Sequence, residues 1–205
     1  MIEHEFDVLY EAGKFLQINI EQDLKKRISQ DGYAILILPG GNSIKLFFPY
    51  LLNMNLSWEK IIIGLSDERC VPKDHDLSNE KQLKQCFLNF IPNPNYCELN
   101  KKFIKKIQKS SPITVLSMGN DGHVASLFPE EFIDWNNKGI GLYNTKKQKP
   151  NRISLTERTV LLSDKIYVLV LGRKKIIKLS LIGKDPVNSY LLSVFNKSRV
   201  LILND

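Results

Sequence analysis

The sequence YAILILPGGNS occupies residues 33–43 and decides the fold class. Its first six residues, Tyr33–Leu38, are apolar or aromatic throughout, which is typical of a strand buried on both faces. Pro39 and two glycines end that strand, and Ser43–Leu52 is predicted to form a helix. A buried strand, a glycine-rich turn and a helix, in this order, form the unit from which parallel α/β sheets are built.

The order of strand and helix recurs along the rest of the chain. A helix is predicted near Ser78–Leu88, a short one after residues 119–123, and another at Lys174–Leu181. Apolar strands that alternate with amphipathic helices indicate an α/β fold with a mostly parallel sheet covered on both faces. The chain has 205 residues without a repeat or a linker, so we expect a single domain over residues 1–205. The further strands are predicted at Lys60–Leu65, Ile113–Met118, Ile153–Thr156, Lys165–Leu171 and Arg199–Leu203.

Composition excludes several classes of protein. Apolar residues make up 43% and charged residues 25%, an ordinary globular composition that argues against disorder. No run of 18 or more apolar residues occurs, and the acidic start at residues 1–7 does not resemble a secretory signal, so we expect neither a membrane partner nor secretion. The three cysteines, Cys70, Cys86 and Cys97, lack zinc-site spacing and are expected to be reduced thiols of a cytoplasmic protein.

The positive net charge raises the question of nucleic-acid binding. The formal charge is +7 and the pI is about 9.2. The lysines are scattered, however, and the densest group, at residues 101–109, follows a helical i, i+4 pattern without the aromatic residues that stack bases. We therefore expect a solvated lysine-rich face and no nucleic-acid partner. A positive field would also favour a phosphorylated small molecule.

Unusual polar or glycine-rich segments follow four of the predicted strands. In open parallel sheets, ligands bind at the carboxyl ends of the strands, where the strand order reverses. The sequence therefore predicts that these segments meet at one ligand site. They are Pro39–Ser43, Ser66–Arg69, Gly119–His123 and Gly172–Lys175.

The first of these segments has the chemistry of a phosphate cradle. Gly40 and Gly41 let the backbone approach a ligand closely, and the helix that begins near Asn42 and Ser43 offers free N–H groups to an anion. The segment is neither a Walker A loop nor a dinucleotide-binding G-x-G-x-x-G motif. A tight turn with a helix cap is the alternative when this segment is taken alone.

Three cationic residues lie directly after or before other predicted strands. Arg69 can fork onto phosphate oxygens, and Asp67 can position it or line the pocket. Arg152, just before a predicted strand, and Lys175, just after one, lie at plausible pocket rims. Solvated loop charges are the alternative for each of these residues.

His123 is the candidate catalytic base. It is expected at the start of a helix beyond a strand, and the ordinary histidine pKa of about 6.5 suits proton transfer near neutral pH. Asp121 can orient the imidazole or the substrate. When this segment is taken without the others, the alternative is a histidine with a purely structural role. The chain has no G-x-S-x-G serine and no H-x-x-x-H pair, which disfavours a serine hydrolase and a metal site.

Together these segments resemble the 6-phosphogluconolactonases, within the wider glucosamine-6-phosphate isomerase/deaminase group. Five motifs carry the resemblance in family order, and the second and third are the specific ones. The motifs are Pro-Gly-Gly-Asn-Ser at 39–43, Asp67-Glu68-Arg69-x-Val71-Pro72-x-Asp74-His75-x-x-Ser78-Asn79, Met118-Gly119-x-Asp121-Gly122-His123-x-Ala125-Ser126-Leu127-Phe128-Pro129, Arg152-Ile153-Ser154-Leu155-Thr156 and Gly172-x-x-Lys175.

The resemblance implies a fold, a reaction and roles for residues. The fold is a modified Rossmann-like, three-layer α/β/α domain, and the reaction is hydrolysis of 6-phosphoglucono-δ-lactone to 6-phosphogluconate without a cofactor. His123 is implied as the general base and Asp121 as its orienting group. Arg69 and Lys175 are implied as phosphate ligands, together with the loop at 40–43 and Arg152 as a further candidate. The implied partner is a small phosphorylated sugar lactone of cytoplasmic pentose-phosphate metabolism, and we expect a monomer or a weak dimer.

The sequence departs from the family pattern in the first motif, and two alternative functions stay open. The family usually has Ser-Gly-Gly-Ser-Thr-Pro where this chain has Pro-Gly-Gly-Asn-Ser-Ile at 39–44, so one or two hydroxyl contacts to phosphate are expected to be missing. The deaminase branch typically has tyrosine at the position of Arg69 and a Phe-Asn-Glu-Pro-like segment after Asp-Gly-His. Arg69 and the sequence at 125–129 favour the lactonase. The other alternative is a catalytically silent module that binds sugar phosphates.

Overall fold

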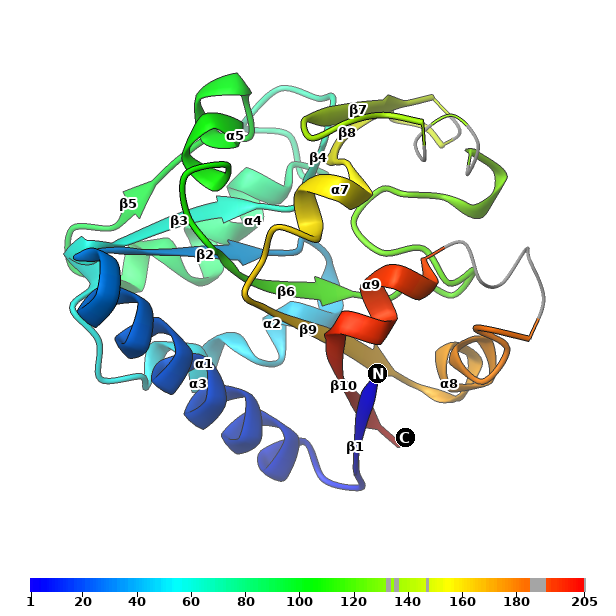
Figure 1. Cartoon of the computed structure of the whole chain (residues 1–205), viewed down its shortest axis with the longest axis horizontal. Helices are drawn as coiled ribbons and strands as arrows, with labels where there is room; N and C mark the ends of the chain where they lie inside the picture. Colours follow the sequence, from blue (N-terminus) through cyan, green and yellow to red (C-terminus); the bar gives the residue numbers. More distant parts are fainter. Residues whose placement is uncertain (132–133, 135–136, 147, 185–190, 205) are drawn as a thin grey trace.

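A parallel sheet forms the centre of the molecule. The computed structural model describes residues 1–131, 134, 137–146, 148–184 and 191–204. Within these residues, seven strands pair in the order β1-β10-β9-β6-β2-β3-β5, and all neighbours are parallel (Figure 1). The strands are β1 (Ile2–Phe6), β2 (Ala34–Leu38), β3 (Ile61–Leu65), β5 (Asn95–Tyr96), β6 (Ile113–Ser117), β9 (Lys165–Leu171) and β10 (Ser198–Leu203).

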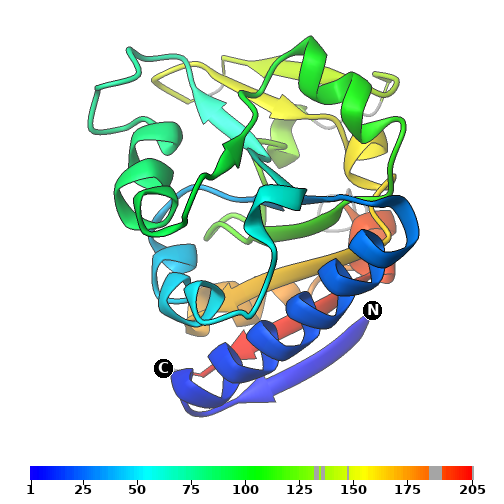
Figure 2. The same cartoon turned by 90° about the vertical axis from the view of Figure 1, so that its left-hand side faces the viewer.

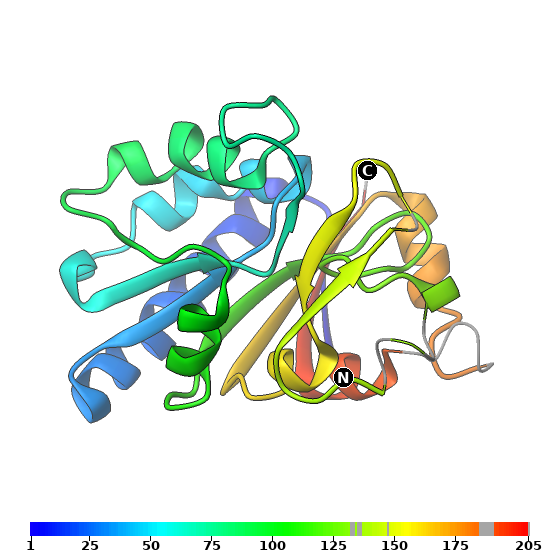
Figure 3. The same cartoon turned by 90° about the horizontal axis from the view of Figure 1, so that it is seen from above.

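Helices cover both faces of this sheet, which confirms the three-layer α/β/α prediction. The alternation of strand side chains explains why: Leu36 of β2 packs into one core cluster, whereas Ile35 and Ile37 pack into the other. The first cluster includes side chains from α1 (Leu9–Asp31), α2 (Asn42–Lys45), α3 (Phe48–Leu52) and α4 (Asn79–Cys86). The second includes side chains from α5 (Lys101–Ile107), α7 (Glu157–Val160), α8 (Arg173–Leu179) and α9 (Leu192–Lys197). Figure 3 shows the two groups on opposite sides of the sheet.

The first strand forms one edge of the sheet, and the first helix crosses the face of the sheet from that edge toward the central strand β2. The long α1 packs Leu16, Ile20 and Leu24 against the sheet, at the four-residue spacing of one helical face. Figure 2 shows α1 in blue lying across β1 and β10, the two strands that form this edge. Within the described residues, none of the helices combines the length and the apolar character that crossing a membrane requires.

The order of the strands reverses beside β2. From β2 the chain moves outward to β3 and β5, then returns so that β6 pairs with the other side of β2 and β9 follows. The loops that leave the carboxyl ends of β2 and β6 therefore diverge to opposite sides, which opens a crevice between them. This topology locates the expected ligand site before any side chain is considered.

A small antiparallel sheet stands beside the carboxyl ends of the large one. It consists of β4 (Asp67–Arg69), β8 (Arg152–Leu155) and β7 (Leu142–Thr145), in the order β4-β8-β7 (Figure 3). The strand predicted at Ile153–Thr156 therefore belongs to this second sheet and not to the parallel one. Because β4 follows β3 after a single residue, Ser66, the second sheet brings its polar side chains to the crevice.

Several predicted elements match the structure closely, and two do not. The strand predicted at Lys165–Leu171 coincides with β9. The helix predicted at Ser43–Leu52 is divided into α2 and α3, because Pro49 cannot donate a backbone hydrogen bond inside a continuous helix. The prediction of His123 at the start of a helix is wrong. Gly122 and Ala125 have φ values of 95° and 51°, which a right-handed helix does not allow, and residues 118–127 form a compact loop instead.

A substitution at Gly64 in β3 can test how tightly the second core cluster is packed. A Cβ atom at this position would overlap the ring of the buried Phe103 on α5. We expect Gly64→Ala to lower the free energy of unfolding by about 1–3 kcal/mol, because the added methyl group overpacks a filled core. Urea unfolding measures this, with Gly139→Ala, where a Cβ would meet open space, as the control. A Gly64→Ala chain as stable as wild type, or one not improved by adding Phe103→Leu, would contradict the packing described.

Candidate active site

The four strand-end segments meet in one cleft. The cleft has a volume of about 170 Å³ and opens where β2, β6 and β9 end. Nine of the ten residues expected at the site line it; the tenth, Asp121, contacts His123. The lining residues are Pro39, Gly40, Gly41, Asn42, Ser43, Asp67, Arg69, Asn79, Ser117, Met118, Gly119, His123, Ala125, Arg152 and Lys175.

The glycine loop forms one wall of the cleft. Gly41 has a φ of 88°, a conformation that favours glycine, and α2 begins directly after it. Lys175, near the start of α8, donates a hydrogen bond from Nζ to Ser43 Oγ at 3.1 Å. Because α2 has only four residues, its peptide dipoles add little positive charge, whereas the ammonium group of Lys175 brings a full positive charge to this wall.

Strand β4 contributes an anchored carboxylate and a guanidinium. Asp67 is buried, and its carboxylate accepts hydrogen bonds from Ser66 Oγ at 3.0 Å and from Ser126 Oγ at 2.5 Å. The second bond ties β4 to the loop that carries His123. Arg69 donates from Nη1 to the side-chain oxygen of Asn79 and to the carbonyl of Leu77 at 3.3 Å.

Arg69 and Arg152 face each other across the small sheet. They are directly opposed residues of β4 and β8. Burial lowers the pKa of the Arg152 guanidinium and the charge of Arg69 lowers it further, whereas Asp67 and Asp121 act in the opposite direction. Arg152 Nη2 donates to Gln148 at 2.9 Å, but its buried Nε has no acceptor among the described residues. Two adjacent guanidinium groups of this kind favour a bound anion.

His123 is held in a defined orientation by its neighbours. Its Nδ1 lies 2.5 Å from Asp121 Oδ1, and its ring centroid lies 4.5 Å from that of Phe128. The same carboxylate oxygen accepts the backbone N–H of His123 at 3.2 Å. Gly119 has no side chain to block this arrangement, since a Cβ there would overlap the His123 ring. Within the described residues, no hydrogen bond engages Nε2, so this nitrogen is the one available to a ligand or a water molecule.

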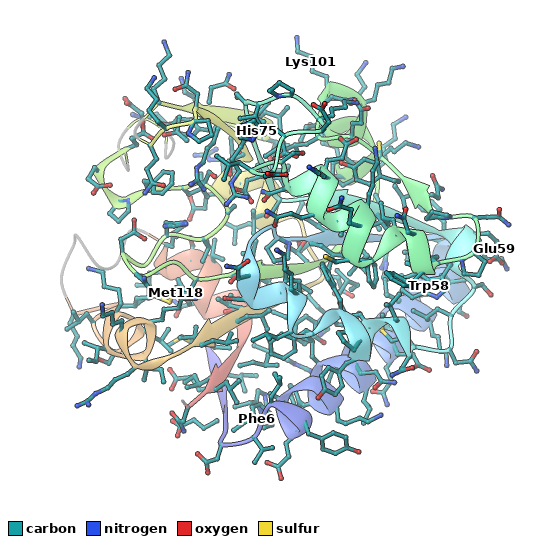
Figure 4. The ribbon with its side chains drawn as sticks, turned by 180° about the vertical axis from the view of Figure 1, so that it is seen from behind. Phe6, Trp58, Glu59, His75, Lys101 and Met118 are labelled. Carbon is teal, nitrogen blue, oxygen red and sulfur yellow. The ribbon has the colours of Figure 1, made fainter. Side chains whose placement is uncertain are left out.

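The other two histidines lie elsewhere. His4 packs on Phe15, with ring centroids 4.3 Å apart. His75 is exposed, and its Nδ1 accepts the backbone N–H of Leu77 at 3.0 Å. Figure 4 shows His75 on an outer loop, well apart from Met118 at the end of β6. Among the described residues, no three histidine, cysteine or acidic side chains gather in a way that could hold a metal ion.

Asn79 is a buried polar residue of the cleft that sequence reasoning did not select for the site. It lies in the second motif, ten residues after Arg69, and it is the first residue of α4. Its position in the motif can be read from the sequence, but only the fold shows that α4 begins beside the glycine loop. Asn79 is 1% exposed and lines the cleft.

Most of the chain matches a known protein family. A family described as glucosamine-6-phosphate isomerases/6-phosphogluconolactonase matches residues 11–190, which is most of the chain. The chain belongs to this family. The matched residues include all four strand-end segments and the small antiparallel sheet.

Individual relatives within the family have the lactonase name. The chain is 29% identical over 194 residues to a 6-phosphogluconolactonase of Neisseria meningitidis, covering 84% of each sequence. It is 28% identical over 193 residues to the one of Thermotoga maritima, covering 87% of this chain and 88% of the relative. The crystal structure of a 6-phosphogluconolactonase from Shewanella baltica superposes with a TM-score of 0.85 at 24% identity, covering 100% of this chain and 98% of that one. This last likeness establishes the shared fold.

The pairing of Asp121 with His123 gives a prediction for stability against pH. Partial burial raises the pKa of Asp121, but the hydrogen bond and charge of His123, with backbone N–H groups, outweigh it and hold the pKa below its usual value. A lowered carboxyl pKa adds stability above the unfolded value of about 3.9. That stability is lost as the pH falls through the lower folded value.

We therefore expect Asp121→Asn to be less stable than wild type at pH 7 and equally stable once the carboxyl is protonated. The difference should stay below about 1 kcal/mol, because the Asp121 side chain is 38% exposed and solvent screens its charge. Urea unfolding of both chains between pH 7 and pH 2 measures it. A difference that does not change over this range would show that the charge of Asp121 does not stabilise the fold.

Proposed function

We propose that the chain hydrolyses 6-phosphoglucono-δ-lactone to 6-phosphogluconate. The observation that carries the proposal is the Asp121–His123 pair in a cleft lined by three cations, in a member of a family whose relatives over most of this chain are 6-phosphogluconolactonases. The cations suit a phosphate group, and the histidine suits the activation of water.

The cations Arg69, Arg152 and Lys175 hold the phosphate end of the substrate in this proposal. They come from β4, β8 and α8, so the fold fixes their relative positions. Backbone N–H groups of the loop at 40–43 add hydrogen bonds to the same group. Binding energy from the phosphate, which is remote from the reacting carbon, then orients the lactone ring for attack.

His123 acts as the general base. Its Nε2 takes a proton from a water molecule while the water oxygen bonds to the lactone carbonyl carbon. The tetrahedral intermediate then breaks the bond between this carbon and the ring oxygen, which takes the proton from the imidazolium. Asp121 keeps the proton on Nδ1, so that Nε2 is the basic nitrogen, and stabilises the positive charge that forms on the ring. Such base catalysis contributes about 10²–10⁴-fold to the rate.

The other activity in the family name fits this site less well. Arg69 lines the cleft at the position where the deaminase branch typically has tyrosine. Ser126, in the segment that distinguishes the lactonase branch, is buried and bonded to Asp67, so that segment is part of the floor of the site. Glucosamine-6-phosphate deamination is therefore not favoured, and a silent sugar-phosphate-binding module is the alternative that an assay must separate.

The proposal also covers the cellular location of the reaction and the oligomeric state of the chain. Its substrate is a phosphorylated metabolite, and we place the reaction in the cytoplasm. All the residues with a proposed role come from this one chain, which supports our proposal of a monomer or a weak dimer.

Replacing the proposed base separates catalysis from binding. We expect His123→Ala to lower kcat by about 10²–10⁴-fold, because water is no longer deprotonated as it attacks. The affinity for 6-phosphogluconate, measured by calorimetry, should change little. Lactone loss is followed with the lactone generated in situ, cold and mildly acidic to slow spontaneous hydrolysis. A fully active His123→Ala chain would show that the base lies elsewhere.

Removing one of the proposed phosphate ligands should chiefly weaken binding. We expect Lys175→Ala to weaken 6-phosphogluconate binding by roughly tenfold or more, because a hydrogen-bonded charge contact is lost. Lys174→Ala is the matched control, since Lys174 is exposed on the same turn of α8 and does not line the cleft. Equal affinities for the two variants would remove Lys175 from the phosphate site.

A further inference from the structure

Asn79 is a buried polar residue of the cleft that the proposed reaction does not use. Its side-chain amide lies between a hydrogen-bond acceptor and a hydrogen-bond donor, and each of these can bond to only one end of the amide. Nδ2 donates to the carbonyl oxygen of Asp67 at 2.9 Å, and Oδ1 accepts from Arg69 Nη1. A carbonyl only accepts and a guanidinium only donates, so this pair of partners fixes which way the amide faces.

Asn79 is itself held in place by Glu68. The Glu68 carboxylate accepts the backbone N–H of Asn79 and that of Glu80, each at 2.7 Å, and the hydroxyl of Ser78 at 3.2 Å. It also accepts the backbone N–H of Arg69 at 2.7 Å. One carboxylate therefore anchors the first turn of α4 and the strand that carries Arg69.

The glycine loop closes on Asn79 from the other side. A Cβ atom at Gly40 would overlap the side-chain amide of Asn79, so the loop passes directly against that amide. Two proposed phosphate-binding elements, the loop at 40–43 and Arg69, thus contact the same side chain.

The bond to Asn79 determines which edge of Arg69 faces the ligand. Nη1 is occupied by Asn79 and by the Leu77 carbonyl at 3.3 Å. In the part of the chain that the structure describes, no acceptor engages Nε or Nη2 of Arg69. These two nitrogens form the edge that can bond a phosphate with two parallel hydrogen bonds.

We infer that Asn79 is a positioning residue that fixes the Arg69 guanidinium for two-pronged binding of the substrate phosphate, and this inference rests on the proposed function. Asn79 acts through Arg69 and does not touch the reacting atoms. The loss of Asn79 should therefore matter only while Arg69 is present.

A double-mutant cycle on ligand affinity tests this role. Calorimetry with 6-phosphogluconate is carried out on wild type, Asn79→Ala, Arg69→Ala and the double variant. We expect Asn79→Ala to weaken binding roughly tenfold, and to cause little further loss once Arg69 is absent. Gln85→Ala, on the exposed side of α4, is the control and should bind as wild type does.

A second variant displaces the same amide by a substitution in the glycine loop. Gly40→Ala keeps Asn79 and Arg69 but pushes the amide away. We expect it to weaken binding in a wild-type background and to lose part of that effect in an Arg69→Ala background, because the remaining part comes from the loop's own contacts with the phosphate. It serves as the test if Asn79→Ala does not fold, which thermal unfolding will show.

The possible outcomes separate the inference from the proposal on which it rests. A wild-type chain that does not bind 6-phosphogluconate, or an Arg69→Ala chain that binds normally, would overturn the assigned phosphate site and the role of Asn79 with it. If Arg69→Ala weakens binding but Asn79→Ala does not, the positioning role alone is overturned. Equal losses from Asn79→Ala with and without Arg69 would also overturn it, because they would show an effect that does not pass through Arg69.

Discussion

The reversal of strand order between β2 and β6 is the constraint on which the rest of the site depends. Parallel strands end at the same edge of a sheet, so the loops after β2, β3, β6 and β9 start side by side. The small antiparallel sheet adds a second constraint, because β4 and β8 place Arg69 and Arg152 opposite each other at that edge. Neither constraint depends on the ligand. The cleft is thus a product of topology, and its chemistry comes from the few side chains that the loops carry there.

Electrostatics and close packing then give the two ends of the cleft different properties. The adjacent guanidinium groups of Arg69 and Arg152 favour an anion, and burial strengthens that preference because water no longer screens their mutual repulsion. The histidine ring, by contrast, is held by Asp121 and Phe128 before any substrate arrives. Glycines make both arrangements possible, since Gly40 and Gly119 leave no room for a side chain against Asn79 and His123. The site is therefore organised in advance, as transition-state stabilisation requires.

The sequence predicted the parallel sheet and the segments at its edge, but not every element. The strands β2, β3, β6 and β9 were predicted because their apolar runs are buried on both faces. The sequence does not predict strand β1, with Glu3, His4 and Glu5, or the polar-rich α1. Strand β1 is stabilised by pairing with β10, and α1 by packing on the face of the sheet, more than by local pattern. The sequence predicts a helix start for the loop after β6, because a positive φ at Ala125 has no signal in the sequence. The role of Asn79 was likewise invisible, because it depends on contacts with Gly40 and Arg69, which lie 39 and 10 residues away in sequence.

The central claim is that this cleft accelerates the opening of a phosphorylated lactone by water. The most direct test is the rate of 6-phosphoglucono-δ-lactone loss with and without the purified chain, with the lactone formed in situ. The account predicts an acceleration above spontaneous hydrolysis that rises in proportion to the concentration of the chain. A chain that binds 6-phosphogluconate but leaves the lactone to decay at its spontaneous rate would contradict the account and identify a sugar-phosphate-binding module without catalysis.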